Sequence, residues 1–207
     1  MANIPPVVKN LLIINGIMLL ATFLTDNLMY EKLGLFYPAS PFFKPHQIIT
    51  HMFMHGNLWH LFFNMYALWI FGCALEYVWG SKRFLLFYMA TGIGAALFHT
   101  FVLWLTSLSM SIPDYYDLLR TPTVGASGAI FGVLLGYGML FPNNVLQLLF
   151  PPVALKAKWF VLIFGAIELV LGITDRGGNV AHFAHLGGMI FAYILIRLWR
   201  KKSKFYF

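Results

Sequence analysis

Long apolar runs, separated by short polar or glycine-containing breaks, follow one another along the whole chain. Because the hydrocarbon core of a bilayer requires about 20 apolar residues of helix, these runs predict membrane-spanning helices. The predicted spans are residues 10–25, 57–77, 84–108, 127–141, 159–173 and 181–199. We therefore expect an all-α membrane protein, a six-transmembrane-helix bundle that forms a single domain over residues 1–207.

Composition agrees with this pattern. Of the 207 residues, 60% are hydrophobic and 10% are charged, whereas soluble domains carry about 25% charged residues. The first run follows a single lysine, is long for a signal peptide, and precedes no small-residue cleavage site, so we expect it to be a retained helix. The single cysteine, Cys73, lies in an apolar run and cannot form an internal disulfide.

The basic residues predict an orientation. An even number of spans places both termini on one side of the membrane, and we assign that side to the cytoplasm because most Lys and Arg then lie inside. The inside residues are Lys9, Lys82, Arg83, Lys156, Lys158, Arg197, Arg200, Lys201, Lys202 and Lys204; the outside residues are Lys32, Lys44, Arg120 and Arg176. The net charge of +7 is thus a topology signal, and we expect no nucleic-acid partner.

The fourth span is too short. About 15 residues at 1.5 Å each cover roughly 22 Å, which is less than the roughly 30 Å hydrocarbon core. If its inner end reaches the cytoplasmic face, its outer end begins below the membrane surface, where backbone must be buried in protein or line a water-filled cavity. The residue at that position is Ser127.

Polar residues inside spans are costly and are candidate functional residues. Spans two, four and six all run from outside inward under this orientation. The polar residues near their starts are His60, Asn64, Ser127, His182 and His185. Topology alone therefore predicts that these side chains gather at similar depth in the outer half of the membrane.

Ser127 has two interpretations. Taken alone, a serine at a helix start is better explained as an N-cap. A serine becomes a nucleophile only when a base accepts its proton, and a helix N-terminus also favours developing negative charge. The surrounding residues are not the G-x-S-x-G elbow of soluble hydrolases, because residue 129 is Ala.

Two stripes of small residues predict how spans four and six pack. Small side chains every four residues let membrane helices approach closely. The stripes are Gly128, Gly132 and Gly136 on span four, and Ala184, Gly188 and Ala192 on span six. Their contact would bring Ser127 beside His185, although plain helix packing explains the stripes equally well.

His60 and Asn64 lie four residues apart and share a helix face. Both side chains can donate hydrogen bonds, as an oxyanion requires in a site of low dielectric. A buried polar pair that joins two helices is the alternative, and the residues alone do not favour either interpretation.

The remaining polar residues have structural explanations. His51 and His55 are also four apart, but without an H-E-x-x-H arrangement or a thiolate pair we favour hydrogen bonding over zinc binding. We interpret His99 as a packed histidine and Glu76 as a structural hydrogen-bond acceptor, and we assign no function to Glu168. No metal and no cofactor is expected.

Together these residues resemble the rhomboid protease family. The matching segments are residues 51–55 (His-Met-Phe-Met-His), 60–64 (His-Leu-Phe-Phe-Asn), 125–128 (Gly-Ala-Ser-Gly) and 184–188 (Ala-His-Leu-Gly-Gly). The first two segments run into each other and count as one group. Each group alone is weak, but the three groups occur in the family's order on helices two, four and six, and the resemblance covers about residues 10–199. At residues 45–47 (Pro-His-Gln) the sequence departs from the Trp-Arg that the family often has there.

The resemblance implies a mechanism. Ser127 would be the nucleophile and His185 the general base of a Ser–His dyad, while His60, Asn64 and the Ser127 backbone N–H would form the oxyanion hole. The expected partners are the lipid bilayer and membrane-protein substrates, whose transmembrane segments would be cleaved near the outer leaflet. We expect a multi-pass protein of the bacterial inner membrane with its active site open to the outer side, and a mobile cap over residues 174–180.

Two other function classes compete with this prediction. A non-catalytic rhomboid-like protein that captures membrane helices would not need Ser127 and His185, and both are present. A small transporter or a metal-dependent membrane enzyme is disfavoured, because no inverted repeat and no credible set of metal ligands stands out in the sequence.

Overall fold

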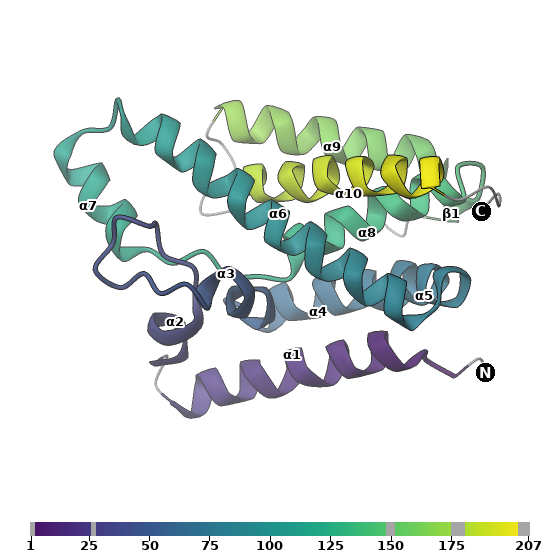
Figure 1. The fold of residues 1–207 in the computed structure, drawn as a ribbon, viewed down its shortest axis with the longest axis horizontal. Coiled ribbons are helices and arrows are strands. Elements are labelled where there is room, and N and C mark those ends of the chain that lie inside the picture. The colour runs from purple at the N-terminus through teal and green to yellow at the C-terminus, as the bar shows by residue number, and fades with distance from the viewer. Residues whose placement is uncertain (1–2, 26–27, 148–151, 175–180, 203–207) are drawn as a thin grey trace.

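The computed structural model describes residues 3–25, 28–147, 152–174 and 181–202, and it is a bundle of helices (Figure 1). The helices that span most of its length are α1 (Pro6–Leu24), α4 (Leu58–Ala67) continued by the π-helical turn η2 (Leu68–Gly72) and α5 (Cys73–Trp79), α6 (Ser81–Ser107), α8 (Ser127–Leu140), α9 (Ala157–Thr174) and α10 (His182–Lys202). The shorter elements are α2 (Leu28–Leu33), α3 (Gln47–Thr50), the 3₁₀ turn η1 (His51–Phe53), α7 (Ile112–Arg120), and the strands β1 (Val145–Gln147) and β2 (Ala154–Lys156).

The predicted spans agree with these helices to within a few residues. Among the described residues, five helices are long and apolar enough to cross a membrane, and α8 is a shorter apolar helix. With 14 residues, α8 is about 21 Å long, so the prediction of a short fourth span is confirmed. The fold is an all-α membrane bundle. Its described residues contain five helices of membrane-spanning length and the shorter α8, and the count of six spans stays a prediction.

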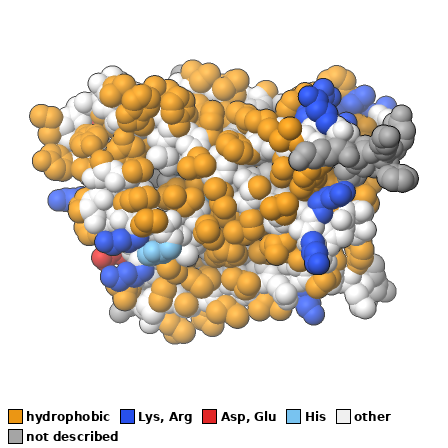
Figure 2. All heavy atoms as spheres, viewed as in Figure 1, with side chains coloured by type: hydrophobic (Ala, Val, Ile, Leu, Met, Phe, Trp, Pro, Cys, Tyr) orange, Lys and Arg blue, Asp and Glu red, His pale blue; other side chains and the backbone are white. Residues whose placement is uncertain are grey.

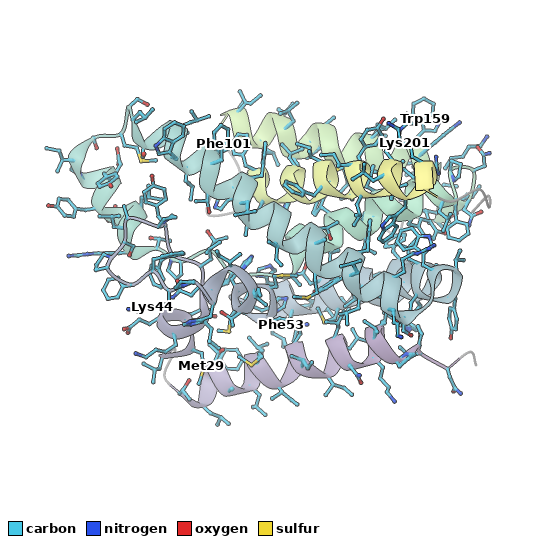
Figure 3. The ribbon with its side chains drawn as sticks, viewed as in Figure 1. Met29, Lys44, Phe53, Phe101, Trp159 and Lys201 are labelled. Carbon is cyan, nitrogen blue, oxygen red and sulfur yellow. The ribbon has the colours of Figure 1, made fainter. Side chains whose placement is uncertain are left out.

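The surface of the bundle is that of a membrane protein. Figure 2 shows hydrophobic side chains across the middle of the face in view, with Lys and Arg gathered toward its two ends. The N and C marks lie at the same end in Figure 1, and Lys201 and Trp159 lie at that end in Figure 3, opposite Lys44 and Met29. The start of α1 and the end of α10 therefore lie at one end of the bundle, and the side of the membrane on which they lie stays a prediction.

Glu76 anchors the start of α1. Its side chain is 2% exposed, and it accepts hydrogen bonds from the backbone N–H groups of Val7 (3.0 Å) and Val8 (2.8 Å) and from the Ser81 hydroxyl (2.7 Å). The first N–H groups of a helix have no partner within it, and a carboxylate also complements the helix dipole. The predicted structural role of Glu76 is confirmed.

Helices α8, α10 and α6 form the centre of the bundle. A Cβ added to Gly188 on α10 would overlap the backbone carbonyl oxygen of Gly128 on α8, and a Cβ on Gly128 would lie 2.6 Å from the Cβ of Ala95 on α6. Real Cβ atoms do not approach other heavy atoms so closely. The backbones of α8 and α10 therefore touch where the sequence predicted their contact.

The glycine stripe of α8 does not contact α10 over its whole length. A Cβ on Gly132 would meet Thr91 of α6 at 2.7 Å, and one on Gly136 would meet Leu75 of α5 at 3.1 Å. The prediction that the stripes on α8 and α10 face each other thus holds at Gly128 and Gly188. Deeper in the membrane, the α8 stripe faces α6 and α5 instead, because helices that cross at an angle diverge from a single point of closest approach.

The two outer segments pack on each other. Leu35 and Thr123 form an antiparallel bridge with backbone hydrogen bonds of 2.9 and 2.8 Å, and the Ser40 hydroxyl donates to the Leu119 carbonyl at 2.6 Å. Gln47 is fully buried. Its side-chain amide accepts a hydrogen bond from the Lys44 N–H and donates one to the Phe42 carbonyl, each at 3.0 Å. Gln47, one of the three residues at which the sequence departs from the resembled pattern, thus holds the first outer segment together.

Helix α7 and the β1–β2 hairpin are absent from the sequence predictions. Ser111 caps α7 by accepting from Asp114 N–H at 3.3 Å, but the helix has only nine residues and a mixed polar surface. The hairpin pairs Val145 with Lys156 and Gln147 with Ala154. Each strand of the hairpin has three residues, which is too short for a periodic signal to emerge from the sequence.

Replacing Gly188 with Ala tests the α8–α10 contact. The new Cβ would collide with backbone rather than with a flexible side chain, so the helices must separate. We expect a loss of about 1–3 kcal/mol or more in the free energy of unfolding, measured by denaturant or thermal unfolding in detergent.

Gly16 provides the matched control, because a Cβ there meets nothing within 4 Å. Gly16→Ala should leave stability unchanged or slightly raised, since Ala is favoured over Gly within helices. Equal stability of Gly188→Ala and Gly16→Ala would contradict the close backbone contact.

Candidate active site

Ser127 is the first residue of α8. The N-cap position belongs to Ala126, whose side chain makes no capping hydrogen bond. The Ser127 Oγ lies 2.7 Å from Nε2 of His185, the fourth residue of α10. The interpretation of Ser127 as a helix cap is therefore wrong, because its hydroxyl is engaged across the bundle by a histidine.

The His185 ring is held on three sides. Its Nε2 meets the Ser127 hydroxyl, and its Nδ1 lies 2.8 Å from Oε2 of Glu168 on α9. Phe131, one turn below Ser127, stacks on the imidazole with ring centroids 4.2 Å apart and planes within 5°. With 7% exposure, the ring has little freedom to rotate.

Glu168 joins two histidines. The same Oε2 atom lies 2.6 Å from Nδ1 of His182 and 2.8 Å from Nδ1 of His185. An ionised carboxylate can only accept hydrogen bonds, so opposite an ionised Glu168 both Nδ1 atoms carry the proton. Nε2 of His185 is then the acceptor that faces the Ser127 hydroxyl.

The chain that enters α8 is fixed by Gly125. Its φ of +138° lies in a region that side chains disfavour, and its N–H donates to the His51 carbonyl at 3.0 Å. A Cβ on Gly125 would lie 3.0 Å from Nε2 of His60 and 3.4 Å from Oγ of Ser127. The absent side chain therefore leaves a space that both the His60 imidazole and the Ser127 hydroxyl border.

Asn64 lies one turn below His60 on α4. Its side chain is 7% exposed, and within the described part of the chain its Nδ2 has no hydrogen-bond partner. Buried amide donors without a partner are rare because desolvation is costly. Of the predicted pair on one face of α4, Asn64 thus has a free amide donor, and His60 has its imidazole close to Ser127.

The predicted hydrogen-bonding role holds for the ring of His51 and not for that of His55, whose two ring nitrogens are buried without a hydrogen-bond partner among the described residues. His51 Nδ1 donates to the Gln47 carbonyl at 2.9 Å, in agreement with the predicted hydrogen-bonding role. Burial lowers the pKa of His51 to about 4. Burial, together with the nearby His60 ring, lowers the pKa of His55 to about 3, and the His55 and His60 ring centroids lie 5.0 Å apart. Both rings outside the span are therefore neutral near pH 7.

His99 is packed, as the sequence predicted. Its ring is 9% exposed, and its Nε2 lies 3.1 Å from the Thr123 hydroxyl. Because Thr123 also forms the bridge to Leu35, His99 ties helix α6 to the segment that precedes Ser127.

Among the described residues, Glu168, His182 and His185 also form a group that could hold a metal ion, since one potential ligand atom of each lies within 4.8 Å of the others. Ligand atoms around a tetrahedral zinc ion are about 3.3 Å apart, given metal–nitrogen bonds near 2.0 Å. The observed distances of 2.6 and 2.8 Å are those of hydrogen bonds. The geometry is thus that of a proton-sharing cluster.

Sequence reasoning missed Glu168 and Phe131. Glu168 lies on α9, the fifth span, which supplies none of the predicted site residues, although an acid inside a span was itself a signal. Phe131 carried no signal, because an aromatic residue in an apolar run is ordinary. The predicted cap, residues 174–180, lies outside the described residues except for Thr174 at the end of α9.

Comparison with known proteins places the chain among related sequences. Residues 43–202 match the family described as the Rhomboid domain. Rhomboid protein 1, mitochondrial, of Saccharomyces cerevisiae is 36% identical over 141 residues, which cover 68% of this chain and 38% of the relative. RHOMBOID-like protein 12, mitochondrial, of Arabidopsis thaliana is 33% identical over 153 residues, covering 72% and 45%.

Rhomboid protease GluP of Bacillus subtilis is 32% identical over 149 residues, which cover 70% of this chain and 24% of the relative. The chain thus spans less than half the length of each of these three relatives. Since two of the three are mitochondrial by name, the matches do not support the expected bacterial inner membrane, whereas an integral membrane protein is supported.

The buried His51 predicts an acid-sensitive fold. Because its folded pKa of about 4 lies below the ordinary value of about 6.5, the unfolded chain binds more protons between these values. The contribution of His51 to the free energy of unfolding is therefore fully present above pH 6.5. It falls as the pH drops toward 4, by up to about 1.4 kcal/mol per pH unit for one histidine. The measurement is the free energy of unfolding in detergent at pH 7.5, 5.5 and 4.5.

The comparison that isolates His51 is His51→Gln. Carboxylates and the other histidines contribute to the pH slope of both proteins, so the difference between wild type and variant belongs to residue 51. A variant with the same slope as wild type would show that His51 is not buried in its neutral form.

Proposed function

Because this chain belongs to the rhomboid family, we propose that it is an intramembrane serine protease in which Ser127 is the nucleophile and His185 is the general base. The observation that carries the proposal is the 2.7 Å contact between Ser127 Oγ and His185 Nε2. A relative, GluP of Bacillus subtilis, is named a rhomboid protease.

The proposed reaction proceeds through an acyl-enzyme. Ser127 Oγ attacks the carbonyl carbon of the scissile peptide bond while its proton passes to Nε2 of His185. His185 then gives that proton to the leaving amine, the C–N bond breaks, and the substrate's acyl group stays on Ser127. A water molecule, deprotonated by His185, hydrolyses the ester and restores the free hydroxyl.

The oxyanion of the tetrahedral intermediate needs donors in place before the reaction. The N–H groups at the start of α8 have no acceptor within the helix, and the helix dipole adds partial positive charge there. His60 lies near Ser127 across the space left by Gly125, and Asn64 Nδ2 has no partner in the described part of the chain. These observations support the Ser127 N–H, His60 and Asn64 as the oxyanion hole.

The position of Ser127 supports a substrate that is itself a membrane segment. Helix α8 is shorter than a bilayer core, so its first residue lies below the membrane surface when its other end reaches the opposite face. Glycine and alanine around Ser127 leave room beside it, since Gly125, Gly128, Ala181 and Ala184 line a pocket that includes its side chain. We infer cleavage of transmembrane segments near the outer leaflet, with both termini of this chain cytoplasmic.

Covalent labelling tests the dyad. The protein, purified in detergent, is treated with a fluorescent fluorophosphonate, and the labelled residue is identified by mass spectrometry. We expect labelling at Ser127 that is lost in Ser127→Ala and reduced by at least about 10³-fold in rate in His185→Ala, since the hydroxyl is a poor nucleophile without its base. The same variants should not cleave a model transmembrane substrate.

His99→Asn serves as the control for removing a buried histidine of the bundle, because His99 contacts Thr123 rather than Ser127. Its labelling should stay within about 3-fold of wild type, a difference of less than 1 kcal/mol in the barrier. Folded wild-type protein that neither reacts with the probe nor cleaves any transmembrane substrate would refute the protease function.

A further inference from the structure

We propose that Glu168 is a positioning residue that turns the Ser127–His185 pair into a Ser–His–Glu relay, with His182 fixing the glutamate. This inference rests on the proposed protease function and concerns one additional residue on a helix, α9, that supplies no member of the dyad. The relay runs from Ser127 Oγ to His185 Nε2 at 2.7 Å, and from His185 Nδ1 to Glu168 Oε2 at 2.8 Å.

The first argument is the tautomer of His185. A neutral imidazole carries one proton, and it serves as a general base toward Ser127 only when that proton is on Nδ1. An ionised carboxylate at 2.8 Å accepts a hydrogen bond and cannot donate one, so it selects the Nδ1–H tautomer. Nε2 is then free to accept the hydroxyl proton.

The second argument is charge. When His185 takes the Ser127 proton it becomes a cation inside a site where Glu168, His182 and His185 are all buried residues, each no more than 9% exposed. A buried cation without a counter-ion is costly. Glu168 already lies within hydrogen-bonding distance, so the imidazolium forms beside a negative charge that has no need to move. Glu168 stays ionised throughout, and the transferred proton passes only between Ser127, His185 and the leaving amine.

The third argument is the role of His182. Its Nδ1 lies 2.6 Å from the same Oε2 atom, so opposite an ionised Glu168 it donates a second hydrogen bond to the acceptor of His185. This second donor restricts rotation of the glutamate and compensates for its removal from water. His182 thus acts on His185 through Glu168, and the spacing of three residues along α10 brings both rings to one side of the helix.

Glu76 shows what a purely structural glutamate looks like in this bundle. Its carboxylate accepts from two backbone N–H groups and a hydroxyl at the start of two helices. Among the described residues, the side-chain contacts of Glu168 are with His182 and His185 instead. A carboxylate directed at the candidate base is placed for chemistry, whereas one directed at helix ends is placed for stability.

Two substitutions at Glu168 separate charge from shape. Glu168→Gln keeps the size and removes the charge, and its amide can donate to Nδ1 and so favour the wrong tautomer. Glu168→Asp keeps the charge with a shorter side chain. We expect Gln to lower kcat for cleavage of a transmembrane substrate by about 10²–10⁴-fold with KM within about 3-fold, by analogy with triad aspartates, and we expect Asp to retain more activity than Gln.

A structural role predicts the opposite order, because Gln preserves packing and Asp does not. Thermal unfolding of each variant in detergent is recorded alongside the kinetics, and ¹⁵N spectra of histidine-labelled protein report the tautomer of His185. We expect wild type to show the Nδ1–H form and Glu168→Gln to show a substantial fraction of the Nε2–H form.

Glu76→Gln is the matched control. It should lower the unfolding temperature while leaving kcat of the folded protein within about 3-fold of wild type. Three outcomes, each obtained with active wild type, would overturn the relay and leave the Ser–His function intact. They are a kcat of Glu168→Gln within about 3-fold of wild type, a higher kcat for Glu168→Gln than for Glu168→Asp, or Glu168 variants that merely fail to fold. Inactive wild type would instead remove the protease function and the relay together.

Discussion

The close approach of α8 and α10 at Gly128 and Gly188 is the constraint on which the site depends. Ser127 precedes Gly128 on one helix, and His185 lies one turn before Gly188 on the other. The 2.7 Å distance between Ser127 Oγ and His185 Nε2 lies next to this point, where backbone meets backbone at the glycines. In lipid there is no hydrophobic drive between helices, so this contact arises from packing of small residues. The same feature therefore provides both the fold and the geometry of the chemistry.

Buried polar groups in this bundle form separate hydrogen-bond networks, and each network has a different role. Glu76 satisfies the N–H groups at the start of α1, and Gln47 satisfies the backbone of the first outer segment. Glu168, His182, His185 and Ser127 form one continuous chain of hydrogen bonds. In a site of low dielectric, such a chain orders the tautomers of its histidines because each acceptor dictates where the next proton must be. Polar residues were few in the spans, and most of them proved to be parts of these networks.

The bundle and the central pair were predictable from sequence, because apolar runs, charge asymmetry and a Gly/Ala spacing are physical signals carried by many residues at once. The full path of the α8 stripe was not, because the direction in which Gly132 and Gly136 face depends on the crossing angle of the helices. Glu168 escaped for a different reason. Its partners lie 14 and 17 residues away on another helix, and only the rotation of α9 about its axis brings the carboxylate to them. Phe131 stacks on His185 but is indistinguishable in sequence from the lipid-facing aromatics.

The most direct test of a serine hydrolase site at the start of α8 is an experimental structure of the protein after reaction with a fluorophosphonate. We expect phosphorus bonded to Ser127 Oγ, His185 Nε2 within hydrogen-bonding distance of that oxygen, and the phosphonyl oxygen within about 3 Å of the Ser127 N–H and of the His60 or Asn64 side chain. Phosphorus bonded to a different residue, or a phosphonyl oxygen that points away from all three donors, would contradict it.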